Sequence, residues 1–600
     1  MKPSTSTVLR LFGLGSALSS FVHAYSPPPA NASKGVSAPP CLPPYLGAEP
    51  GHNHQGEAPW GDRTAESDPE DVPDTGVVRK YEWTIQRTTL APDGFEQSLL
   101  TVNGQFPGPL VEANWGDTVE VTVHNNITDP EEGTAMHWHG IHQYRTGLMD
   151  GVSGVTQCPI VPGGSFTYRW KASTYGSTWY HGHHALQYGG GLWGPMVIYG
   201  PSHVDFDIDV GPVTLSDYYH YPYEDIARDA ISTSNDSKVY APRSNNHLIN
   251  GKNNFDCSLS TKNNTCHNNA PRAQFKFQSG KVHKLRLINT SVEAMQIFSI
   301  DGHNITVTTM DFVPVEPYEV EYVILGVGMR AEVLVNGTGK PDQAYYMRTR
   351  IQCAATLANE TLATIYYEGT PTTAIPASKT THALPNFSST CGDPDLPKKK
   401  PIYKKRVPKP DLTLNYFIDF KTNASGNHQW LMNNVTFLAD WSRPLMLEAA
   451  AGNTEYLSQP QHILTTIPDD VRHVRVVLNN NFSVHPMHIH GGDFQILSEA
   501  DGRWNGSVAY RKNPARADTE FLRRNGHLVV QFEAKNPGVW SFHCHTAWHA
   551  SVGLYINFLV KPRTLRGTKI PADVREMCKA WATYRELNGQ NALPFDSGLR

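Results

Sequence analysis

The sequence lacks the features of membrane-spanning, nucleic-acid-binding and disordered proteins. It contains no apolar run of about 18 residues, the length that a membrane-spanning helix requires. Charged residues make up only 18% of the chain, and the net charge of -5 argues against nucleic acid as the main partner. The hydrophobic share of 39% is that of an ordinary globular protein, which excludes a disordered chain, a coiled coil and a collagen.

Glycine and proline are plentiful instead, and they favour an all-β fold. The 600 residues include 48 Gly and 44 Pro, the composition of a turn-rich chain. Apolar and polar residues alternate in residues 116–123, 280–289 and 470–479, as in strands that are buried on one face. Three such segments predict three copies of one β unit. Residues 571–587 show helical spacing, so the chain is expected to end in a short helix and a tail.

The N-terminus has the layout of a secretory signal. Lys2 and Arg10 precede a short apolar run over residues 11–22, and Ala24 supplies a small residue for cleavage. The run is too short to span a bilayer, so no membrane anchor is expected. Thirteen Asn-x-Ser/Thr sequons follow, among them Asn31, Asn126, Asn235, Asn289, Asn336, Asn423 and Asn505. We therefore expect a secreted, glycosylated protein in which disulfides can form.

The eight cysteines divide into one metal-ligand candidate and seven others. Cys544 lies between two histidines, which favours a metal thiolate over a disulfide. At least one of the remaining seven must then be unpaired within the chain. Cys257 and Cys266 are close enough in sequence to form a local bridge, and Cys41 is the expected unpaired cysteine.

Histidine is the unusual residue of this chain, and ten of the 27 histidines fall in four clusters. Residues i and i+2 of a strand point to the same face, so a His-x-His pair presents two imidazoles side by side, as a shared metal site requires. A lone histidine is usually structural, but four clusters together favour metal binding. The clusters are His137-Trp138-His139, His181-Gly182-His183, His485-Pro486-Met487-His488-Ile489-His490 and His543-Cys544-His545-Thr546-Ala547-Trp548-His549.

The donor set favours copper. A thiolate with two imidazoles and a weak or absent axial ligand is the blue-copper arrangement. Zinc also accepts Cys and His, but a structural zinc site closes on four ligands, far fewer than the clusters offer. Non-haem iron usually takes a carboxylate, and none lies inside the clusters.

The strand that carries Cys544 is expected to serve two sites. Cys544 points to one face while His543 and His545 point to the other, so one strand reaches a mononuclear site and a separate cluster. Setting aside Cys544 with His485 and His549 leaves eight imidazoles, which suit three coppers. The backbone and side chain of Cys544 then form a short covalent route between the two sites.

These four motifs resemble the copper signatures of the multicopper oxidases, and the chain is similar over roughly residues 77–600 to three-domain laccases of ascomycete fungi. The resemblance implies three cupredoxin-like Greek-key β-sandwich domains. Together with the composition, it predicts a signal peptide at 1–24, an irregular N-terminal extension at 25–76, cupredoxin-like domains at 77–201, 202–375 and 411–570, a linker at 376–410, and a C-terminal helix and tail at 571–600. The basic runs of the linker, Lys398–Lys400 and Lys404–Arg406, are interpreted as solvated charge.

The resemblance also implies four copper ions and their ligands. His485, Cys544 and His549 would bind one type 1 copper, and His137 and His488 would bind one type 2 copper. The two type 3 coppers would take His139, His181, His183, His490, His543 and His545. The second unit offers only His303 in the equivalent place, so it is expected to hold no copper.

Further roles follow from the same resemblance. Asp150 would lie near the trinuclear cluster and supply protons. Leu554 takes the axial position of the type 1 copper, where it cannot ligate, so a raised reduction potential is expected. Glu224 and Asp225 are candidates for the acid that accepts the proton of a phenol; each could instead be a solvated loop acid.

Two further disulfides are implied by the family. Cys158 and Cys578 would link the first domain to the C-terminal tail, and Cys353 and Cys391 would form a second bridge. The N-terminal Cys41 departs from the family pattern because it lacks a near partner.

The C-terminus and the second motif also bear on the resemblance. The final Asp596–Arg600 is similar to the processed ends of ascomycete laccases, in which the tail inserts towards the trinuclear site. His184 follows the second motif, where the family commonly has an apolar residue, and Gly182 replaces a common serine. The metal-facing pair itself is intact.

The activity implied is that of a laccase. Phenols would give up one electron each at the type 1 copper, and the trinuclear cluster would reduce O2 to water with four electrons and four protons. A small phenolic substrate and O2 are therefore the expected partners of a monomeric enzyme. Within phenol chemistry, the reaction could instead be oxidative coupling of a polyketide or pigment precursor. Outside it, a ferroxidase of the same fold and a non-enzymatic copper-binding protein are the competing functions.

Overall fold

The computed structural model describes residues 41–47, 58–231, 242–358, 360–377, 391–393 and 395–588. The predicted signal peptide, the final Asp596–Arg600 and the sequons at Asn31 and Asn235 lie outside the described residues. The described part of the N-terminal extension has turns and one isolated bridge, at Leu42, but no helix or strand before Val78. Within the described residues, no helix combines the length and the apolar character that crossing a membrane requires.

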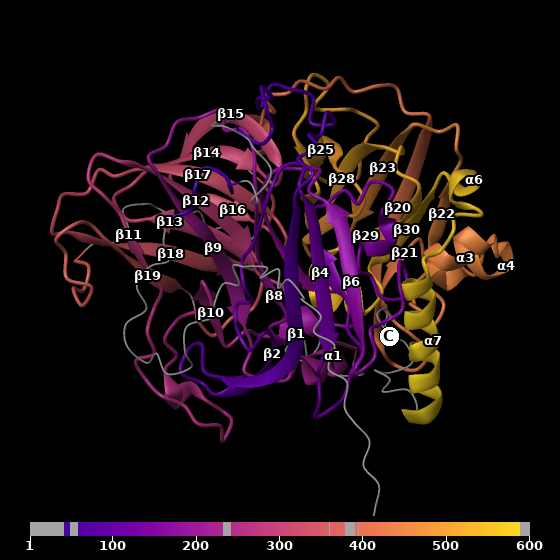
Figure 1. Ribbon diagram of the computed structural model, residues 1–600, viewed down its shortest axis with the longest axis horizontal. Helices are drawn as coiled ribbons and strands as arrows, with labels where there is room; N and C mark the ends of the chain where they lie inside the picture. Colours follow the sequence, from indigo (N-terminus) through magenta and orange to yellow (C-terminus); the bar gives the residue numbers. More distant parts are fainter. Residues whose placement is uncertain are drawn as a thin grey trace, which may run out of the picture. The chain divides into compact units, whose positions relative to one another are not determined.

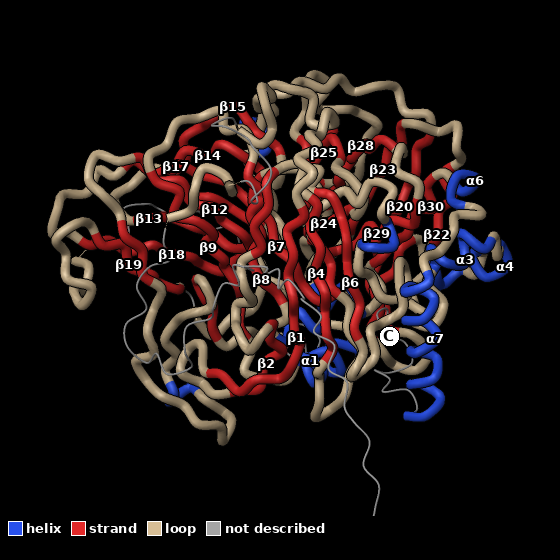
Figure 2. Tube along the Cα trace, viewed as in Figure 1, coloured by secondary structure: helices blue, strands red, loops and turns tan. Residues whose placement is uncertain are grey.

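Strands dominate the described chain, and the helices lie mostly at its periphery (Figure 2). The strands form pairs of sheets in three successive portions of the sequence (Figure 1). In the first portion the sheet orders are β2-β1-β4-β6 and β3-β8-β7-β5. Its strands are β1 Val78–Leu90, β2 Gln97–Val102, β3 Val111–Asn114, β4 Thr118–Asn125, β5 Met136–Trp138, β6 Ser165–Lys171, β7 Gly176–Gly182 and β8 Trp193–Tyr199.

The second portion has sheets of order β10-β9-β12-β17-β14-β15 and β11-β19-β18-β13-β16. Its strands are β9 Ile208–Tyr218, β10 Asn246–Ile249, β11 Gln274–Lys276, β12 Val282–Asn289, β13 Met295–Ile300, β14 Ile305–Met310, β15 Val313–Val320, β16 Val323–Leu325, β17 Arg330–Asn336, β18 Ala344–Gln352 and β19 Thr361–Tyr366.

The third portion has sheets of order β21-β20-β23-β28-β25-β26 and β22-β30-β29-β24-β27. Its strands are β20 Leu412–Thr422, β21 His428–Met432, β22 Leu464–Ile467, β23 His473–Asn480, β24 His485–Ile489, β25 Phe494–Asp501, β26 Arg516–Ala517, β27 Thr519–Leu522, β28 Gly526–Glu533, β29 Gly538–Cys544 and β30 Tyr555–Val560. The helices are α1 Tyr223–Ile231, α3 Leu445–Ala451, α4 Thr454–Leu457, α5 Ala547–Ser551, α6 Pro562–Leu565 and α7 Ala572–Asn588.

One strand arrangement recurs in all three portions. The first long strand of each pairs in parallel with the strand predicted from alternation: β1 with β4, β9 with β12 and β20 with β23. The second strand of each pair, β4, β12 or β23, in turn pairs antiparallel with β6, β17 or β28, respectively. A parallel pair requires a crossover connection, which a simple meander lacks. The prediction of three cupredoxin-like β-sandwiches in an all-β chain is confirmed.

Alternation predicted the strand positions better than their burial. β4 alternates between half-buried and buried residues along its whole length, as expected. β12 is buried on both faces after its first residue. The polar side chains of β12 are covered because this strand packs against β7 of the first domain, where Arg286 donates to the Ser177 hydroxyl at 3.0 Å.

The C-terminal helix is confirmed as α7. Its apolar face buries Val574, Met577 and Trp581. The disulfide Cys158–Cys578 ties it to the first domain, and Cys257–Cys266 and Cys353–Cys391 form the other two predicted bridges. Cys41 and Cys544 are free, as expected.

One expectation for a polar residue was wrong, and the burial of a second residue excludes one sequon. Lys399 of the linker is not solvated: it is buried and paired with Asp393, whereas its neighbours Lys398 and Lys400 are exposed. Asn289 lies in a sequon but is fully buried, and its amide donates to two backbone carbonyls. Asn289 therefore cannot carry a glycan, because its nitrogen is enclosed by protein.

Candidate metal centres

The four histidine clusters begin on two equivalent pairs of adjacent strands and continue just past the strand ends, with His549 in α5. In the first domain β5 lies beside β7, with His137 directly opposite His181. In the third domain β24 lies beside β29, with His488 opposite His543 and Met487 opposite Cys544. The corresponding pair in the second domain, β13 and β18, has no histidine in either strand. Duplicated strand pairs therefore carry both sets of donors.

Cys544 faces one side of β29 and lies within a group that we call the Cys544 group: Cys544, His485 and His549. The Cys544 sulfur is 3.5 Å from the Nδ1 atoms of both His485 and His549, and these two nitrogens are 3.1 Å apart. Trp430 packs against both imidazoles, with ring centroids 4.6 and 4.7 Å away. Both Nδ1 atoms and the sulfur thus converge on one point.

The Cys544 group is buried on most sides but reaches the surface at His549, which is only half-buried. Burial raises the pKa of the Cys544 thiol to about 12 and lowers the pKa of His549 to about 3. The imidazole is therefore a neutral donor, and the thiol needs a nearby cation to ionise. A bound metal ion supplies that positive charge and deprotonates a coordinating thiol.

The opposite face of β29 contributes to a second group, the eight-histidine group: His137, His139, His181, His183, His488, His490, His543 and His545. All eight are buried. His490 Nε2 lies 3.1 Å from His543 Nε2, and His139 Nδ1 lies 3.2 Å from His545 Nε2. Histidines of the first and third domains therefore interleave.

Three fully buried Nε2 atoms of the eight-histidine group have no hydrogen-bond partner in the described protein, which fits metal ligation. They belong to His137, His181 and His488. A buried polar atom without a partner is costly, so such atoms usually accept a proton or a metal. Two nitrogens on the far side of the rings are occupied: His137 Nδ1 is 2.7 Å from the Asp150 carbonyl, and His543 Nδ1 is 2.9 Å from the Cys544 carbonyl, whereas His485 Nε2 and His545 Nδ1 have no partner in the described chain. An outer hydrogen bond of this kind fixes the ring so that the other nitrogen can ligate.

Asp150 lies against the eight-histidine group, as predicted. Its Oδ2 is 2.8 Å from His490 Nδ1, and its Oδ1 is 3.4 Å from His137 Nδ1 with no hydrogen-bond partner of its own in the described chain. Burial opposes ionisation, but the interactions with His490 and His137 prevail and hold the pKa of Asp150 well below its ordinary value. Gly151 permits the approach: at its φ of +81°, an added Cβ would lie 1.7 Å from the Met136 carbonyl oxygen.

A second carboxylate at this group was missed from the sequence. Asp518 accepts at 3.2 Å from His139 Nε2, and its carbonyl accepts at 2.9 Å from His488 Nδ1. Burial opposes its ionisation, but Arg330 and the two histidines hold the pKa of Asp518 well below its ordinary value. Asp518 lies outside every histidine cluster, in a loop before β27, so no sequence pattern pointed to it.

Leu554 belongs to the same apolar core as Cys544 and is fully buried. Its backbone carbonyl accepts from the Cys544 amide at 3.2 Å. This contact is consistent with the axial position that the sequence predicts for Leu554.

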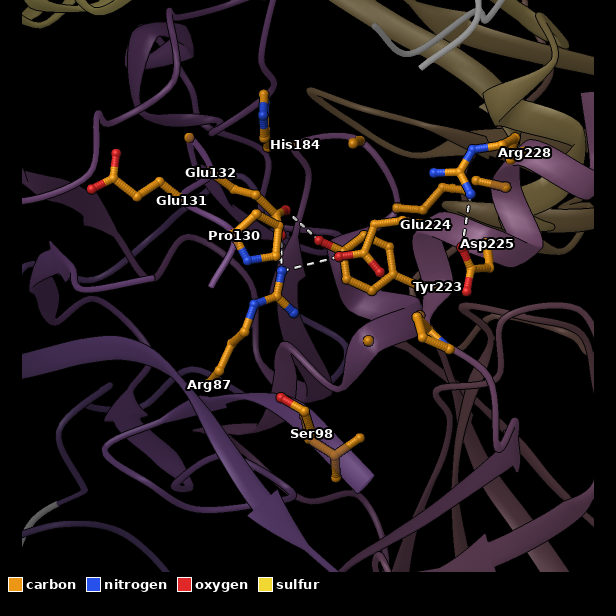
Figure 3. A pocket seen from close by; sticks show the side chains of 18 of the residues that line it. Arg87, Ser98, Pro130, Glu131, Glu132, His184, Tyr223, Glu224, Asp225 and Arg228 are labelled. Atoms are coloured by element: carbon orange, nitrogen blue, oxygen red, sulfur yellow. Dashed lines mark hydrogen bonds and ion pairs between the residues drawn. The ribbon is translucent and has the colours of Figure 1, made fainter. Parts of the chain in front are cut away.

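Glu224 and Asp225, predicted near the type 1 copper, make their contacts elsewhere. Glu224 pairs with Arg87 at 3.0 Å, and Asp225 pairs with Arg228 at 2.7 Å (Figure 3). Both line a cavity of about 1150 Å³ whose described lining includes no residue of the Cys544 group. Their role as proton acceptors stays a prediction that these contacts do not support.

The structure offers a different acid, Glu293, which was missed. Its neighbour Val292 accepts at 2.8 Å from the amide of Ala547, so Glu293 lies where α5, the helix that carries Trp548 and His549, begins. Burial, and then the charge of Asp217, raise the pKa of Glu293 to about 8, partly opposed by Tyr219 and Trp548. The only signal in the sequence is its position just after the alternating strand β12, which alone does not distinguish it from other loop acids.

Comparison with known proteins agrees with this arrangement. Three multicopper oxidase family models match residues 84–203, 209–370 and 431–564. The chain belongs to the multicopper oxidase family and is an oxidoreductase.

Several similar proteins come from fungi. The chain is 38% identical to the oxidoreductase OpS5 of Beauveria bassiana, over 91% of this chain and 92% of that protein. It is 34% identical to dihydrogeodin oxidase of Aspergillus terreus (88% and 90% covered) and 36% identical to Laccase-1 of Botryotinia fuckeliana (90% and 92%).

Solved structures show the same likeness. The laccase of Botrytis aclada matches with a TM-score of 0.80 and 32% identity, covering 88% of this chain and 96% of that one. Fet3p, described as a multicopper oxidase that functions in iron import, matches with a TM-score of 0.74 and 25% identity, covering 86% and 98%.

Proposed function

We propose that this protein is a laccase that oxidises phenols by one electron at a type 1 copper and reduces O2 to water at a trinuclear copper cluster. The observation that carries the proposal is the placement of Cys544 and His543 on opposite faces of β29. One strand thereby joins a sulfur-containing group near the surface to a buried group of eight imidazoles. Copper cycles between two oxidation states, so four ions together store the four electrons that O2 requires.

We assign the donors to the metal positions by the family pattern. Cys544, His485 and His549 would hold the type 1 ion. His137 and His488, whose Nε2 atoms lack partners in the described chain, would hold the type 2 ion. The remaining six imidazoles would hold the type 3 pair: His139, His181, His183, His490, His543 and His545.

Substrate is expected to dock at the half-buried edge of His549. Trp430 packs on that imidazole, and Phe482 continues the aromatic surface with 39% of its side chain exposed. Aromatic rings pack favourably on such a surface. Glu293 would accept the phenol proton, because removal of an electron makes the phenol hydroxyl strongly acidic.

The chain also provides routes for electrons and protons. The His543 Nδ1 atom donates to the Cys544 carbonyl at 2.9 Å, so a hydrogen bond shortens the path from the sulfur to the eight-histidine group. Asp150 has one carboxylate oxygen without a partner in the described chain, beside that group, and would pass protons to the reduced oxygen.

Two classes of natural substrate are candidates. Relatives named laccase suggest broad phenol oxidation, whereas the relative named dihydrogeodin oxidase suggests one defined compound, as in oxidative coupling of a polyketide or pigment precursor. A ferroxidase role has weaker support, because Fet3p matches less well than the laccase structure. We also propose that the protein is secreted and glycosylated; Asn126, Asn336 and Asn505 are exposed sequon asparagines.

The test combines copper analysis with oxygen uptake. Purified protein should hold four coppers per chain and consume O2 with a simple diphenol, yielding water and no peroxide. A higher kcat/KM for Fe(II) than for phenols would favour the ferroxidase. Copper-loaded protein without turnover would favour a non-enzymatic copper-binding protein.

A further inference from the structure

Arg330 of the second domain lies at a point where all three domains meet. It opens β17 and is fully buried. Its Nε donates to the carbonyl of Ser177 in β7 of the first domain at 3.3 Å, and its Nη1 donates to the Gly328 carbonyl at 3.0 Å. The guanidinium also donates two hydrogen bonds of 2.6 Å to the carboxylate of Asp518 in the third domain. Such a bidentate pair fixes the carboxylate in both position and plane.

The carboxylate that Arg330 holds is the one that contacts the eight-histidine group. Asp518 Oδ1 lies 3.2 Å from His139 Nε2. An ionised carboxylate only accepts, so His139 must donate from Nε2, which leaves the lone pair of Nδ1 facing His545 Nε2 at 3.2 Å. The tautomer and ring orientation of His139 therefore depend on where Asp518 lies.

The loop that carries Asp518 is fixed by the second domain as well. Asp311 Oδ2 accepts from the amides of Asp518 and Thr519 at 3.1 and 3.3 Å, and Asp311 Oδ1 accepts from the Arg330 amide at 3.0 Å. The Asp518 carbonyl in turn accepts from His488 Nδ1. One network thus positions a histidine of the first domain and a histidine of the third.

The second domain also touches the imidazoles directly. Gly328 has a φ of +86°, and a Cβ added there would lie 2.9 Å from His139 Cε1 and 3.0 Å from His545 Cδ2. The backbone turn before Arg330 therefore lies flat on two of the predicted ligands. His139, His488 and Asp518 are close enough together to suggest a cation site, but both Asp518 oxygens already bind the guanidinium, so this group is a support and not a further site.

We propose that Arg330 is a positioning residue for the trinuclear site: through Asp518 it sets the tautomer and orientation of His139 and aligns the histidines of the first and third domains. The second domain, which is expected to offer no ligand of its own, is thereby part of the metal centre. This inference rests on the proposed function only for its copper readouts.

The test replaces Arg330 and compares it with a matched buried arginine. Arg330→Met removes the bidentate support, and Arg330→Lys leaves a single donor. The control is Arg286→Met: Arg286 is also buried in the second domain and also bidentate, but it binds Asp209 and Glu332, and neither carboxylate forms a hydrogen bond or ion pair with the eight-histidine group in the described chain. Copper per chain, the type 2 hyperfine splitting and the type 1 absorption are measured for each.

Arg330→Met should weaken copper retention at the trinuclear site by about 10- to 100-fold, the usual effect of losing an outer partner of a metal ligand. Its type 1 absorption should persist, Arg330→Lys should lie between, and Arg286→Met should keep all four coppers. Unchanged copper and hyperfine splitting in Arg330→Met would overturn the proposal. So would equal losses at both sites in Arg330→Met and Arg286→Met, since that pattern reflects general destabilisation.

Two further measurements test the positioning role of Arg330 separately from misfolding and from copper binding. Arg330→Met with Asp311→Asn and Asp518→Leu removes the buried arginine together with both carboxylates that pair with it, so this variant should fold yet still lose trinuclear copper; full retention would contradict the inference. In crystals of copper-free protein, Arg330→Met should show the His139 ring turned away from its position in the unaltered chain. An unmoved ring refutes the positioning role even if the protein proves not to be a copper enzyme.

Discussion

The two faces of β29 hold donor groups of opposite character. The Cys544 group lies in an apolar core and opens to the surface at His549. The eight-histidine group is buried throughout and is supported by two carboxylates, Asp150 and Asp518. In the proposed function, substrate must reach the entry point for electrons, whereas oxygen reduction needs protons delivered at fixed atoms. The difference teaches that one strand can serve both needs because its side chains alternate.

The largest effect on this comparison should come from breaking the link between the faces. Cys544→Ser should abolish the intense blue thiolate-to-copper absorption and nearly all turnover, because it removes both a ligand and the electron route. Absorption spectra and oxygen uptake measure the two effects. Cys41→Ser is the control, since Cys41 is exposed and free. Retention of both the blue band and turnover in Cys544→Ser would refute the assignment.

The next prediction separates the rate of oxygen reduction at the eight-histidine group from the rate of electron entry at the Cys544 group. Asp150→Asn should slow oxygen reduction by about 10²-fold, the lower range for loss of an acid–base group, while substrate still reduces the type 1 copper at the normal rate. Stopped-flow absorption resolves these steps. The control is Asp117→Asn, because Asp117 is equally buried in the first domain but pairs with Arg79. An unslowed reoxidation step would remove Asp150 from proton supply.

The third effect tests the exposed face through pH. The pKa of Glu293 is about 8, so the carboxyl is protonated below that value and becomes a base as pH rises through it. Phenol oxidation that depends on this base should therefore increase with pH up to about 8 before other groups intervene. Glu293→Gln should flatten this rise and lower kcat/KM for phenols by about 10-fold to 10²-fold, with little change for ferrocyanide, which releases no proton.

Glu224→Gln is the paired control for Glu293→Gln. Glu224 was one of two candidate acids, with Asp225, that the sequence offered, yet it pairs with Arg87 in a separate cavity. If Glu224→Gln, and not Glu293→Gln, flattens the pH profile, the assignment drawn from the structure is wrong and the one drawn from the sequence is right.

The smallest effect concerns the reduction potential of the Cys544 group alone. Leu554→Met should lower the type 1 reduction potential, because a thioether adds a donor that stabilises Cu(II). Redox titration of the blue band measures the shift, and oxygen reduction by prereduced protein should not change. A potential that stays the same or rises contradicts an axial role for Leu554.

The sequence predicted local features well and contacts between distant segments poorly. The alternating segments became β4, β12 and β23, and the helical spacing near the C-terminus became α7. Lys399 was interpreted as solvated because it lies in a basic run, but contacts with other parts of the chain bury it. Local pattern carries no information about what a neighbouring domain will cover.

The donor groups show the same division. His-x-His spacing was enough to bring out eight histidines, since i and i+2 share a face whatever the rest of the fold does, and His485, His549 and Cys544 lie in the same clusters. Asp518, Glu293 and Arg330 carry no such spacing. Asp518 contacts His139 of the first domain, Arg330 of the second domain holds Asp518, and Glu293 lies beside the start of α5; only the packed chain defines these contacts.

The sequence by itself determined the strand repeats, the donor types and the two-faced strand, because each depends on periodicity within a few residues. Only the tertiary structure decided which carboxylates support the histidines, which acid lies at the start of the helix that carries His549 and how the second domain contributes. Those relations join residues hundreds of positions apart, such as His139 with Asp518, and burial brings them together through the packing of three domains.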